Sequence, residues 1–329
     1  MKHLIFQALA DAARTGGPVA LGIITGVKGS SPQKLGAKAI FHADGRIQGT
    51  LGGGCLEAEA QRLALQSLKT GQPATFDLIL DHDFGWDDGL ICGGKVLGVI
   101  LPNAQNTGEK FWSDLAEPSR AQVWGVRKDF GFARMESPPP TFPLSHFPAP
   151  DWLYTETITP PCALWIAGSG HIARAVAPLA LQLDFAVTIF DDRPELANHQ
   201  FFPREVAIRI GNWGELCAEQ FPDVPTFGLI VTRGHQHDAL VLESWIHRPF
   251  QFLGMIGSTR KARTISDHFI KKKIATPEEV SRVACPVGIK IRSRSVMEIA
   301  VDILAQYIDK RAEVVVGKRV ASAGQIELV

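Results

Sequence analysis

The sequence lacks an excess of charge of either sign. Lysine and arginine together number 34, aspartate and glutamate also number 34, and the formal net charge is therefore zero. A protein whose main partner is a nucleic acid or an anionic membrane usually carries a basic patch, because such a patch neutralises phosphate charge. The charge balance therefore predicts that the chain uses neither as its main partner.

The sequence also has no long hydrophobic run and few cysteines. No apolar run approaches the roughly 20 residues that span a bilayer. The opening residues, MKHLIFQALADAARTGG, have helical spacing and lack the small-residue cleavage site of a signal peptide. The five cysteines are odd in number and show neither C-x-x-C pairs nor zinc spacing. We therefore expect a cytoplasmic protein with reduced thiols.

The chain of 329 residues is long enough for two domains, each with its own core. The segment SPPPTFPLSHFPAP, which begins at Ser137, is too rich in proline for a helix or a central strand. We predict an α/β protein with a mixed α/β domain over residues 1–136, a proline-rich linker over 137–160, and a Rossmann-like, doubly wound parallel sheet over 161–329. The last helix of that second domain is predicted over 296–310.

The most informative stretch is LWIAGSGHIARAVAPLALQLDFAVTIFDDRPE, residues 164–195. It reads as strand, glycine turn, helix, strand and acid, which is the order of a dinucleotide-binding crossover. Gly168 permits the turn, Gly170 lets a phosphate approach the backbone, and the helix that starts near His171 offers free N–H groups to an anion. Asp191 follows Gly168 by about the 20 residues expected of an acid that binds a ribose. The stretch predicts a phosphate-bearing ligand, for which NAD is one candidate.

Further candidate residues follow two later predicted strands of the second half. His235 and His237 come after the apolar run FGLIVT, and Ser258 and Arg260 open a helix after FLGMI. Ligands of open α/β sheets bind at the carboxyl ends of the strands. We therefore include these four residues in the predicted site, Ser258 and Arg260 as a second anion-binding position.

The first half carries two cysteine–glycine elements. In GTLGGGCLEAEA, Gly53 and Gly54 precede Cys55, which lies at the start of a predicted helix over 55–69. Consecutive glycines rarely serve packing, and a helix N-terminus favours a thiolate. Cys92 lies in the second element, DDGLICGG. The alternative interpretation is that both cysteines are small buried residues.

These motifs together resemble the XdhC/CoxI family, the accessory factors of xanthine dehydrogenase and related molybdenum hydroxylases. The resemblance covers nearly the whole chain and is carried by six elements: GTLGGGCLEAEA, DDGLICGG, AGSGHIARAVAPLA, FDDRPE, VTRGHQHD and GMIGSTRKAR. It implies a maturation chaperone, rather than a turnover enzyme, that binds the molybdenum cofactor (molybdopterin), supports its sulfuration and inserts it into the apo-enzyme. The implied partners are apo xanthine dehydrogenase or a related hydroxylase, a cysteine desulfurase, and a second copy of the chain in a homodimer.

The resemblance also gives the candidate residues a common ligand. Molybdopterin is a phosphorylated pterin dithiolene, so its carrier needs a phosphate cradle, a slot for the pterin and a soft group near the metal. The glycine turn at Gly168 and Gly170 can supply the cradle, and a thiolate at Cys55 can act as the metal ligand, because soft ligands suit a thiophilic metal. The ligand of the turn is then either NAD or the pterin phosphate.

Two other functions compete with the chaperone. An NAD-dependent oxidoreductase would use His235 or His237 as its acid/base, but it leaves both cysteine–glycine elements without a role. A hydrolase with Cys55 as nucleophile would need a histidine base. The histidines of the first half that could serve are His3, His42 and His82.

Overall fold

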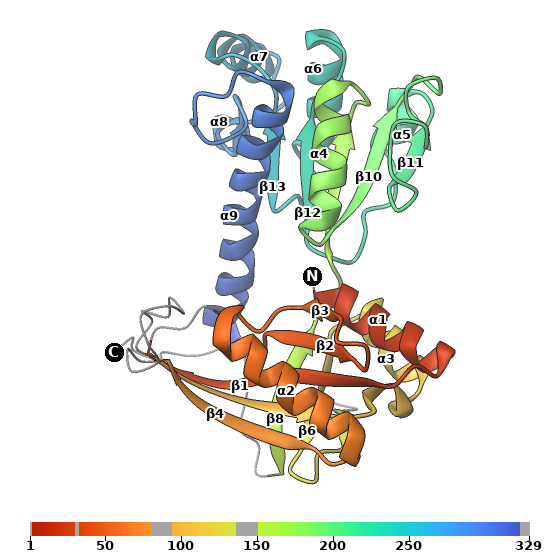
Figure 1. Cartoon of the computed structure of the whole chain (residues 1–329). Helices are drawn as coiled ribbons and strands as arrows, with labels where there is room; N and C mark the ends of the chain where they lie inside the picture. Colours follow the sequence, from red (N-terminus) through yellow and green to blue (C-terminus); the bar gives the residue numbers. More distant parts are fainter. Residues whose placement is uncertain (1, 30–32, 81–93, 136–150, 323–329) are drawn as a thin grey trace. The chain divides into compact units, whose positions relative to one another are not determined.

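The computed structural model describes residues 2–29, 33–80, 94–135 and 151–322. Cys92 and the proline-rich segment 137–150 lie outside these ranges. The chain forms two compact units, Met1–Pro160 and Pro161–Val329 (Figure 1).

The first unit is built on an antiparallel sheet in the order β3-β2-β1-β5-β4. Its strands are β1 (Val19–Lys28), β2 (Lys38–His42), β3 (Ile47–Gly49), β4 (Ala74–Leu80) and β5 (Gly94–Leu101). A smaller antiparallel sheet, in the order β7-β6-β8, consists of β6 (Gln122–Arg127), β7 (Phe132–Met135) and β8 (Trp152–Ile158). The helices are α1 (Lys2–Thr15), α2 (Gly54–Thr70), η1 (Ala104–Thr107) and α3 (Glu109–Ala116).

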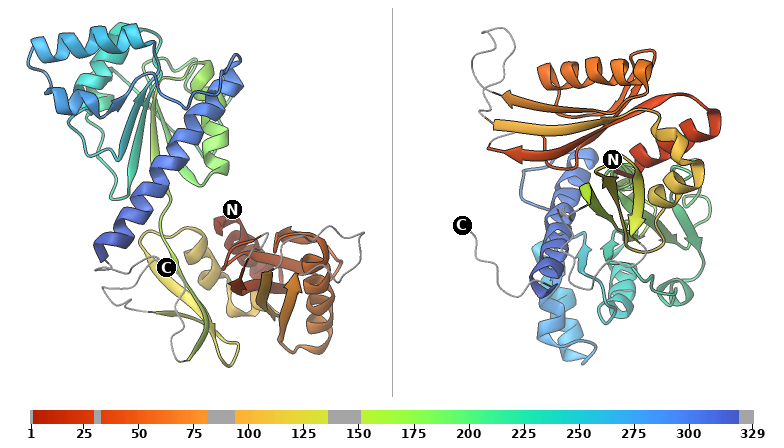
Figure 2. Two further views of the ribbon diagram at one scale, coloured as in Figure 1. Left: turned by 90° about the vertical axis from the view of Figure 1, so that its left-hand side faces the viewer. Right: turned by 90° about the horizontal axis from the view of Figure 1, so that it is seen from below.

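The two faces of the five-stranded sheet bury different cores. One face packs against α2 through residues such as Leu56 and Ala60. The other face shares a core with α1, α3 and the small sheet, in which Trp112 and Trp124 are fully buried. Figure 2 shows α2 on the outer side of the large sheet, away from the small sheet.

A buried ion pair joins the two sheets of the first unit. The Nζ of Lys38 on β2 lies 2.5 Å from a carboxylate oxygen of Glu156 on β8, and both side chains are almost completely buried. Lys38 also donates to the hydroxyl of Tyr154 at 3.1 Å. The backbone carbonyl of Lys38 accepts a hydrogen bond from Thr50 N at 3.2 Å. The pair therefore anchors the strand that holds the start of the GTLGGGC loop.

The second unit is a parallel sheet in the order β11-β10-β9-β12-β13-β14. Its strands are β9 (Cys162–Ala167), β10 (Phe185–Asp191), β11 (Ala207–Ile210), β12 (Thr226–Ile230), β13 (Phe252–Met255) and β14 (Val283–Ala284). Its helices are α4 (His171–Gln182), α5 (Trp213–Cys217), α6 (His235–Trp245), α7 (Thr259–Lys271), α8 (Pro277–Ser281) and α9 (Val296–Ser322). The sheet order reverses between β9 and β12, where Rossmann-like folds bind their ligands.

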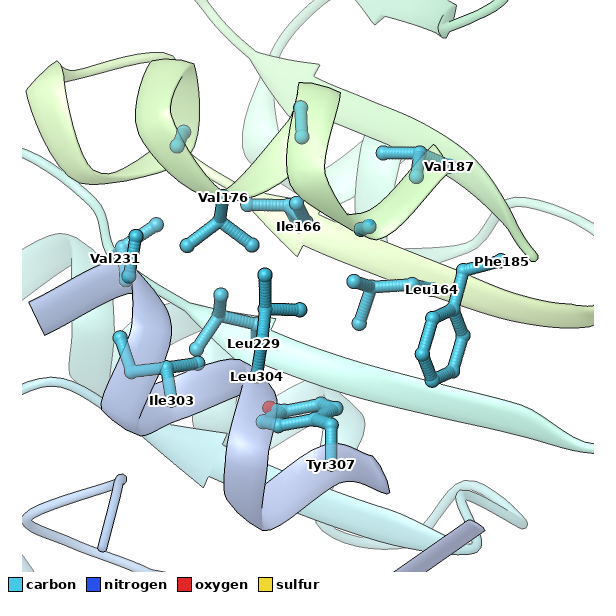
Figure 3. Packing of buried hydrophobic residues seen from close by; sticks show 14 of the residues in the cluster. Leu164, Ile166, Val176, Phe185, Val187, Leu229, Val231, Ile303, Leu304 and Tyr307 are labelled. Carbon is cyan, nitrogen blue, oxygen red and sulfur yellow. The ribbon is translucent and has the colours of Figure 1, made fainter. Parts of the chain in front are cut away.

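Strand β9 shows why this sheet is covered on both faces. Leu164 and Ile166 point to a core shared with α4 and α9, as Figure 3 shows. Ala163 and Trp165, which alternate with them, point to the core shared with α5, α6 and α7. A strand that is buried on both faces reads as a continuous apolar run, and this run is the signal that predicts β9 from the sequence.

The structure confirms the predicted fold class, a mixed α/β unit followed by a Rossmann-like parallel sheet. Two local predictions differ from it. Residues 152–158, predicted as part of the linker, form β8, because WLYTETI is rich in the aromatic and β-branched residues that favour strands and contains no proline. The last helix does not end at residue 310 but continues to Ser322, since the residues that follow include no proline and a single glycine does not stop a helix.

Candidate functional site

The two glycines of the turn after β9 have different reasons to be glycine. Gly168 has a φ of +116°, and a Cβ added there would lie 2.4 Å from the carbonyl oxygen of Val231. The turn therefore packs directly against the segment that follows β12. Gly170, the N-cap of α4, has an ordinary φ of −73°, and a Cβ there would meet nothing within 4 Å. Gly168 thus serves packing, whereas Gly170 leaves the start of α4 open to an approaching group.

Asp191 orders this turn. Its side chain is fully buried, and one carboxylate oxygen accepts hydrogen bonds from the backbone N and the hydroxyl of Ser169, each at 2.7 Å. Arg193 donates its Nε to one oxygen and its Nη2 to the other, each at 2.8 Å, and its backbone N completes the set at 3.0 Å. The carboxylate predicted to bind a ribose is therefore already occupied by the protein itself.

The Asp191 carboxylate gives a prediction for stability against pH. Burial alone would raise its pKa, but the hydrogen bonds and charge of Arg193 and the bonds from Ser169 outweigh burial and hold the pKa below the ordinary 3.8. A carboxyl whose pKa is lower in the folded state stabilises the fold above its unfolded-state pKa and loses that contribution as pH falls through the folded-state value. We expect Asp191→Asn to flatten the loss of stability below about pH 4, measured by urea unfolding at a series of pH values. An unchanged pH dependence would contradict this.

In the segment between β12 and α6, as in the turn after β9, a buried carboxylate accepts hydrogen bonds from the backbone N and the hydroxyl of one residue. Gly234 is the N-cap of α6, and Asp238, buried in the first turn, accepts hydrogen bonds from the backbone N of Thr232 at 3.1 Å and from its hydroxyl at 2.7 Å. The other oxygen of Asp238 is paired with Nζ of Lys261 on α7, which also donates to the carbonyl of Ile256 at 2.9 Å. Asp238 and Lys261 therefore fix the starts of α6 and α7 relative to each other.

Arg233 lies beside the same turn. Its Nη2 is 2.9 Å from a carboxylate oxygen of Asp192, and also 2.9 Å from Nε2 of His237. A guanidinium is only a donor, so Nε2 of His237 accepts, and the proton of the neutral ring is on Nδ1. The ring of His237 also makes an edge contact with Trp213, at 6.4 Å between centroids. His237 is therefore held by a cation, which does not suit a general base.

The remaining predicted residues of this unit lie at the same carboxyl edge of the sheet. His171 and His235 are exposed first residues of α4 and α6. Ser258 caps α7, because its hydroxyl accepts a hydrogen bond from Lys261 N at 3.2 Å. Arg260, in the first turn of α7, is exposed. Strand ends and helix starts thus gather all the predicted residues of the second unit at one edge.

In the first unit, Gly53, Gly54 and Cys55 form the N-terminus of α2. Gly53 is the N-cap with a φ of +73°, and a Cβ added there would meet nothing within 4 Å. The carboxylate of Glu57 accepts hydrogen bonds from Thr50 Oγ1 at 2.8 Å and from Gly53 N at 3.1 Å. The glycine loop therefore wraps around Glu57 and leaves open space where a side chain at Gly53 would be.

The described cysteines are all free thiols, but they differ in burial. Cys55 is half-buried, whereas Cys217 on α5 is buried, and burial raises the pKa of the Cys217 thiol to about 11. Among the described residues, no group of three or more histidine, cysteine or acidic side chains is arranged to hold a metal ion. Whether Cys92 lies near Cys55 is a question outside the described residues.

Sequence analysis missed three residues that build the turns: Glu57, Arg193 and Arg233. A signal was present for Glu57. At both α2 and α6 a threonine lies two or three residues before the N-cap glycine, and an acid occupies the fourth helical position, Glu57 in one and Asp238 in the other. Such a pattern is close to a capping box, in which an acid of the first turn bonds the N-terminal N–H groups.

Comparison with known proteins gives consistent matches. The profile of the XdhC Rossmann domain matches residues 164–307, and that of the XdhC and CoxI family matches residues 12–79. Together they cover more than half of the chain. No helix within the described part of the chain is long and apolar enough to cross a membrane.

Individual relatives match over most of their length. A protein of Bacillus subtilis (strain 168) that is named as a probable subunit of xanthine dehydrogenase is 25% identical, with 95% of this chain and 98% of the relative covered. The molybdenum cofactor insertion chaperone PaoD of Escherichia coli (strain K12) is 24% identical, with 93% and 88% covered. A crystal structure described as a xanthine dehydrogenase from Bacillus halodurans has a TM-score of 0.77 at 22% identity, covers 98% of both chains, and shows that the fold is shared.

Proposed function

The chain belongs to the XdhC and CoxI family, and from this premise we propose that it is a maturation factor that binds the molybdenum cofactor and delivers it to a molybdenum hydroxylase. The names of two relatives, one a probable subunit of xanthine dehydrogenase and the other a molybdenum cofactor insertion chaperone, support a role in maturation. The proposal extends to sulfuration of the cofactor, with a cysteine desulfurase as partner, and to xanthine dehydrogenase or a related hydroxylase as the recipient.

The observation that carries the proposal is the N-terminus of α2. Cys55 is half-buried in the first turn, two residues after the N-cap Gly53, which has open space where a side chain would be. A thiolate there is a soft ligand of the kind that a thiophilic metal prefers. The chemistry of this residue therefore fits the metal end of the cargo.

The second unit offers a fit for the phosphate end. The first N–H groups of an α-helix have no partner within the helix and carry the positive end of its dipole. At α4 the N-cap is Gly170, and a Cβ at that position would meet nothing within 4 Å. Gly170 and His171 would therefore hold a phosphate by backbone contacts. Gly168, whose backbone N donates to the carbonyl of Phe190 at 2.8 Å, would shape the turn that presents them. We propose Cys55 of the first unit and this turn of the second unit as two separate contacts.

The competing oxidoreductase finds little support in the geometry. Its ribose-binding acid, Asp191, is buried and engaged by Ser169 and Arg193, and the accepting nitrogen of His237 is bound by Arg233. The cysteine hydrolase needs a histidine base. Of its candidates, His42 has its Nε2 bonded to Gln48 at 3.1 Å, and His82 lies outside the described residues.

The proposed function is tested by cofactor transfer. The full chain, purified from cells that make the cofactor, is assayed for molybdenum and pterin and then mixed with an apo molybdenum hydroxylase. We expect bound cofactor in both assays and a gain in hydroxylase activity that the apo-enzyme alone does not show. Protein without metal or pterin, together with NAD-dependent turnover of about 1 per second or faster, would instead support the oxidoreductase.

A further inference from the structure

We infer that Arg233 is the specificity-determining residue of the turn after β9, and that it selects a phosphate group over the ribose diol of a nicotinamide dinucleotide. This inference deepens the proposed function and rests on it, because it concerns the phosphate contact proposed for Gly170 and His171. It assigns the choice between the two ligand classes to a residue of the β12–α6 segment.

The ion pair of Arg233 places this residue near the end of β9. Strand β9 lies between β10 and β12 in the parallel sheet. Asp192 directly follows β10, and Arg233 follows β12, yet their side chains are joined at 2.9 Å. The ion pair therefore passes across the end of β9, where the chain enters the glycine turn. The glycine turn after β9 itself lies against the segment that carries Arg233, because a Cβ added at Gly168 would collide with the backbone carbonyl of Val231.

Arg233 retains hydrogen-bond donors that its protein partners do not use. A guanidinium has five N–H donors in a fixed planar fork, a shape that matches a phosphate. Within the described part of the chain, the hydrogen-bond partners of this side chain, Asp192 and His237, engage only Nη2. Nε and Nη1 thus keep their N–H groups for a ligand, and the side chain is 42% exposed at this edge.

The acidic residues at this edge of the sheet are paired with basic residues. Asp191 is paired with Arg193, and Asp238 is paired with Lys261. Asp192, which is 24% exposed, faces Arg233 at 2.9 Å and Arg193 at 3.8 Å. Each of these carboxylates is therefore paired with a basic side chain, and Arg233 balances the charge of Asp192. An incoming ligand meets the positive end of α4 and the N–H groups of Arg233 that Asp192 and His237 do not engage. Such a surface favours an anion.

A bound NAD would need an acid that is free to accept hydrogen bonds from its ribose. In the fingerprint for NAD, the acid at the end of the second strand accepts the ribose hydroxyls. Here that acid is Asp191, whose oxygens already receive five hydrogen bonds from Ser169 and Arg193. Binding a ribose would break some of these bonds and release a buried charge. The geometry thus favours a phosphate, because the acid that the NAD fingerprint assigns to the diol is already engaged.

The test uses the full chain, with inorganic pyrophosphate and NAD⁺ as probes in calorimetric titrations. We expect pyrophosphate to bind the natural chain more tightly than NAD⁺. Arg233→Gln should weaken pyrophosphate binding about 10- to 100-fold, since hydrogen bonds to charged groups contribute about 1.5–3 kcal/mol. Arg233→Lys keeps the charge without the planar fork and should recover only part of the affinity.

Asp192→Asn distinguishes the two ligand classes by the sign of its effect. Removing this negative charge should leave pyrophosphate affinity unchanged or raise it by up to about tenfold, because the carboxylate no longer competes with pyrophosphate for Arg233. If Asp192 instead accepts ribose hydroxyls, the same variant weakens NAD⁺ binding. Tighter binding of NAD⁺ than of pyrophosphate, or a loss of NAD⁺ affinity in Asp192→Asn, overturns the inference.

Arg209→Gln is the matched control for non-specific attraction. Arg209 lies on β11 and is paired with Glu219 at 3.0 Å; its side chain is 48% exposed, close to the value for Arg233. We expect it to change pyrophosphate affinity less than twofold. Equal losses in Arg209→Gln and Arg233→Gln, or no pyrophosphate binding to a natural chain that still transfers cofactor, overturn the inference and leave the proposed function standing. If the chain fails to transfer cofactor but Arg233→Gln still weakens pyrophosphate binding, only the proposed function is rejected.

Discussion

Replacing Cys55 with serine is expected to abolish cofactor transfer to an apo molybdenum hydroxylase while the melting temperature changes by no more than about 2 °C. The thiol is half-buried at the start of α2 rather than in the core, so a hydroxyl in its place finds water and costs little stability. A serine oxygen, however, is a harder ligand than a thiolate and does not suit a thiophilic metal. The variant is measured by thermal unfolding and by the transfer assay.

Cys217→Ser is the matched control for this substitution. Cys217 is 4% exposed in the core shared with α6, so the new hydroxyl would be buried, at a cost of about 1–3 kcal/mol. We expect a melting temperature several degrees lower and unchanged transfer by the protein that remains folded. The opposite pattern for Cys55→Ser, a lower melting temperature with transfer intact, would make Cys55 a packing residue. Cys92→Ser in the same assay tests whether the second cysteine–glycine element contributes to transfer.

The parts of the fold that could be predicted are those with a local signal. The apolar runs of β9 and β10, the glycine turn and the helical spacing of α4 are all contained in residues 164–195. The sheet of the first unit was harder to predict, because β5 pairs not only with the preceding strand β4 but also with β1, and β2, β3 and α2 also lie between β1 and β5 in the chain. Its order depends on which faces bury apolar residues, and periodicity alone does not determine that.

The candidate site shows the same limit more sharply. The spacing from Gly168 identifies Asp191, but spacing cannot show that Arg193, two residues later, folds back on its carboxylate. The pair of Asp192 with Arg233 joins residues 41 positions apart. Sequence therefore located the edge of the sheet where the polar residues gather. The roles of the acids depend on side-chain pairings that only the structure contains.

The turn after β9 gives the second large effect, a contrast between two glycines two residues apart. Gly168→Val should destabilise the second unit by about 3–5 kcal/mol, at the upper end of single substitutions. At a φ of +116° a β-branched residue is strained, and its Cβ would lie 2.4 Å from the backbone carbonyl oxygen of Val231, which cannot move aside as a side chain would. Urea unfolding followed by tryptophan fluorescence measures the loss.

Gly170→Val, measured in parallel, should keep the fold and lose the ligand. Its φ of −73° and ψ of −172° suit a β-branched residue, and open space surrounds the position of the new Cβ. We expect the free energy of unfolding to change by less than about 1 kcal/mol, the size of an N-cap effect. The branched side chain would nevertheless cover the first N–H groups of α4, so pyrophosphate binding should fall below detection. If Gly170→Val binds pyrophosphate as the natural chain does, the start of α4 is not the phosphate contact, whatever Gly168→Val does to stability.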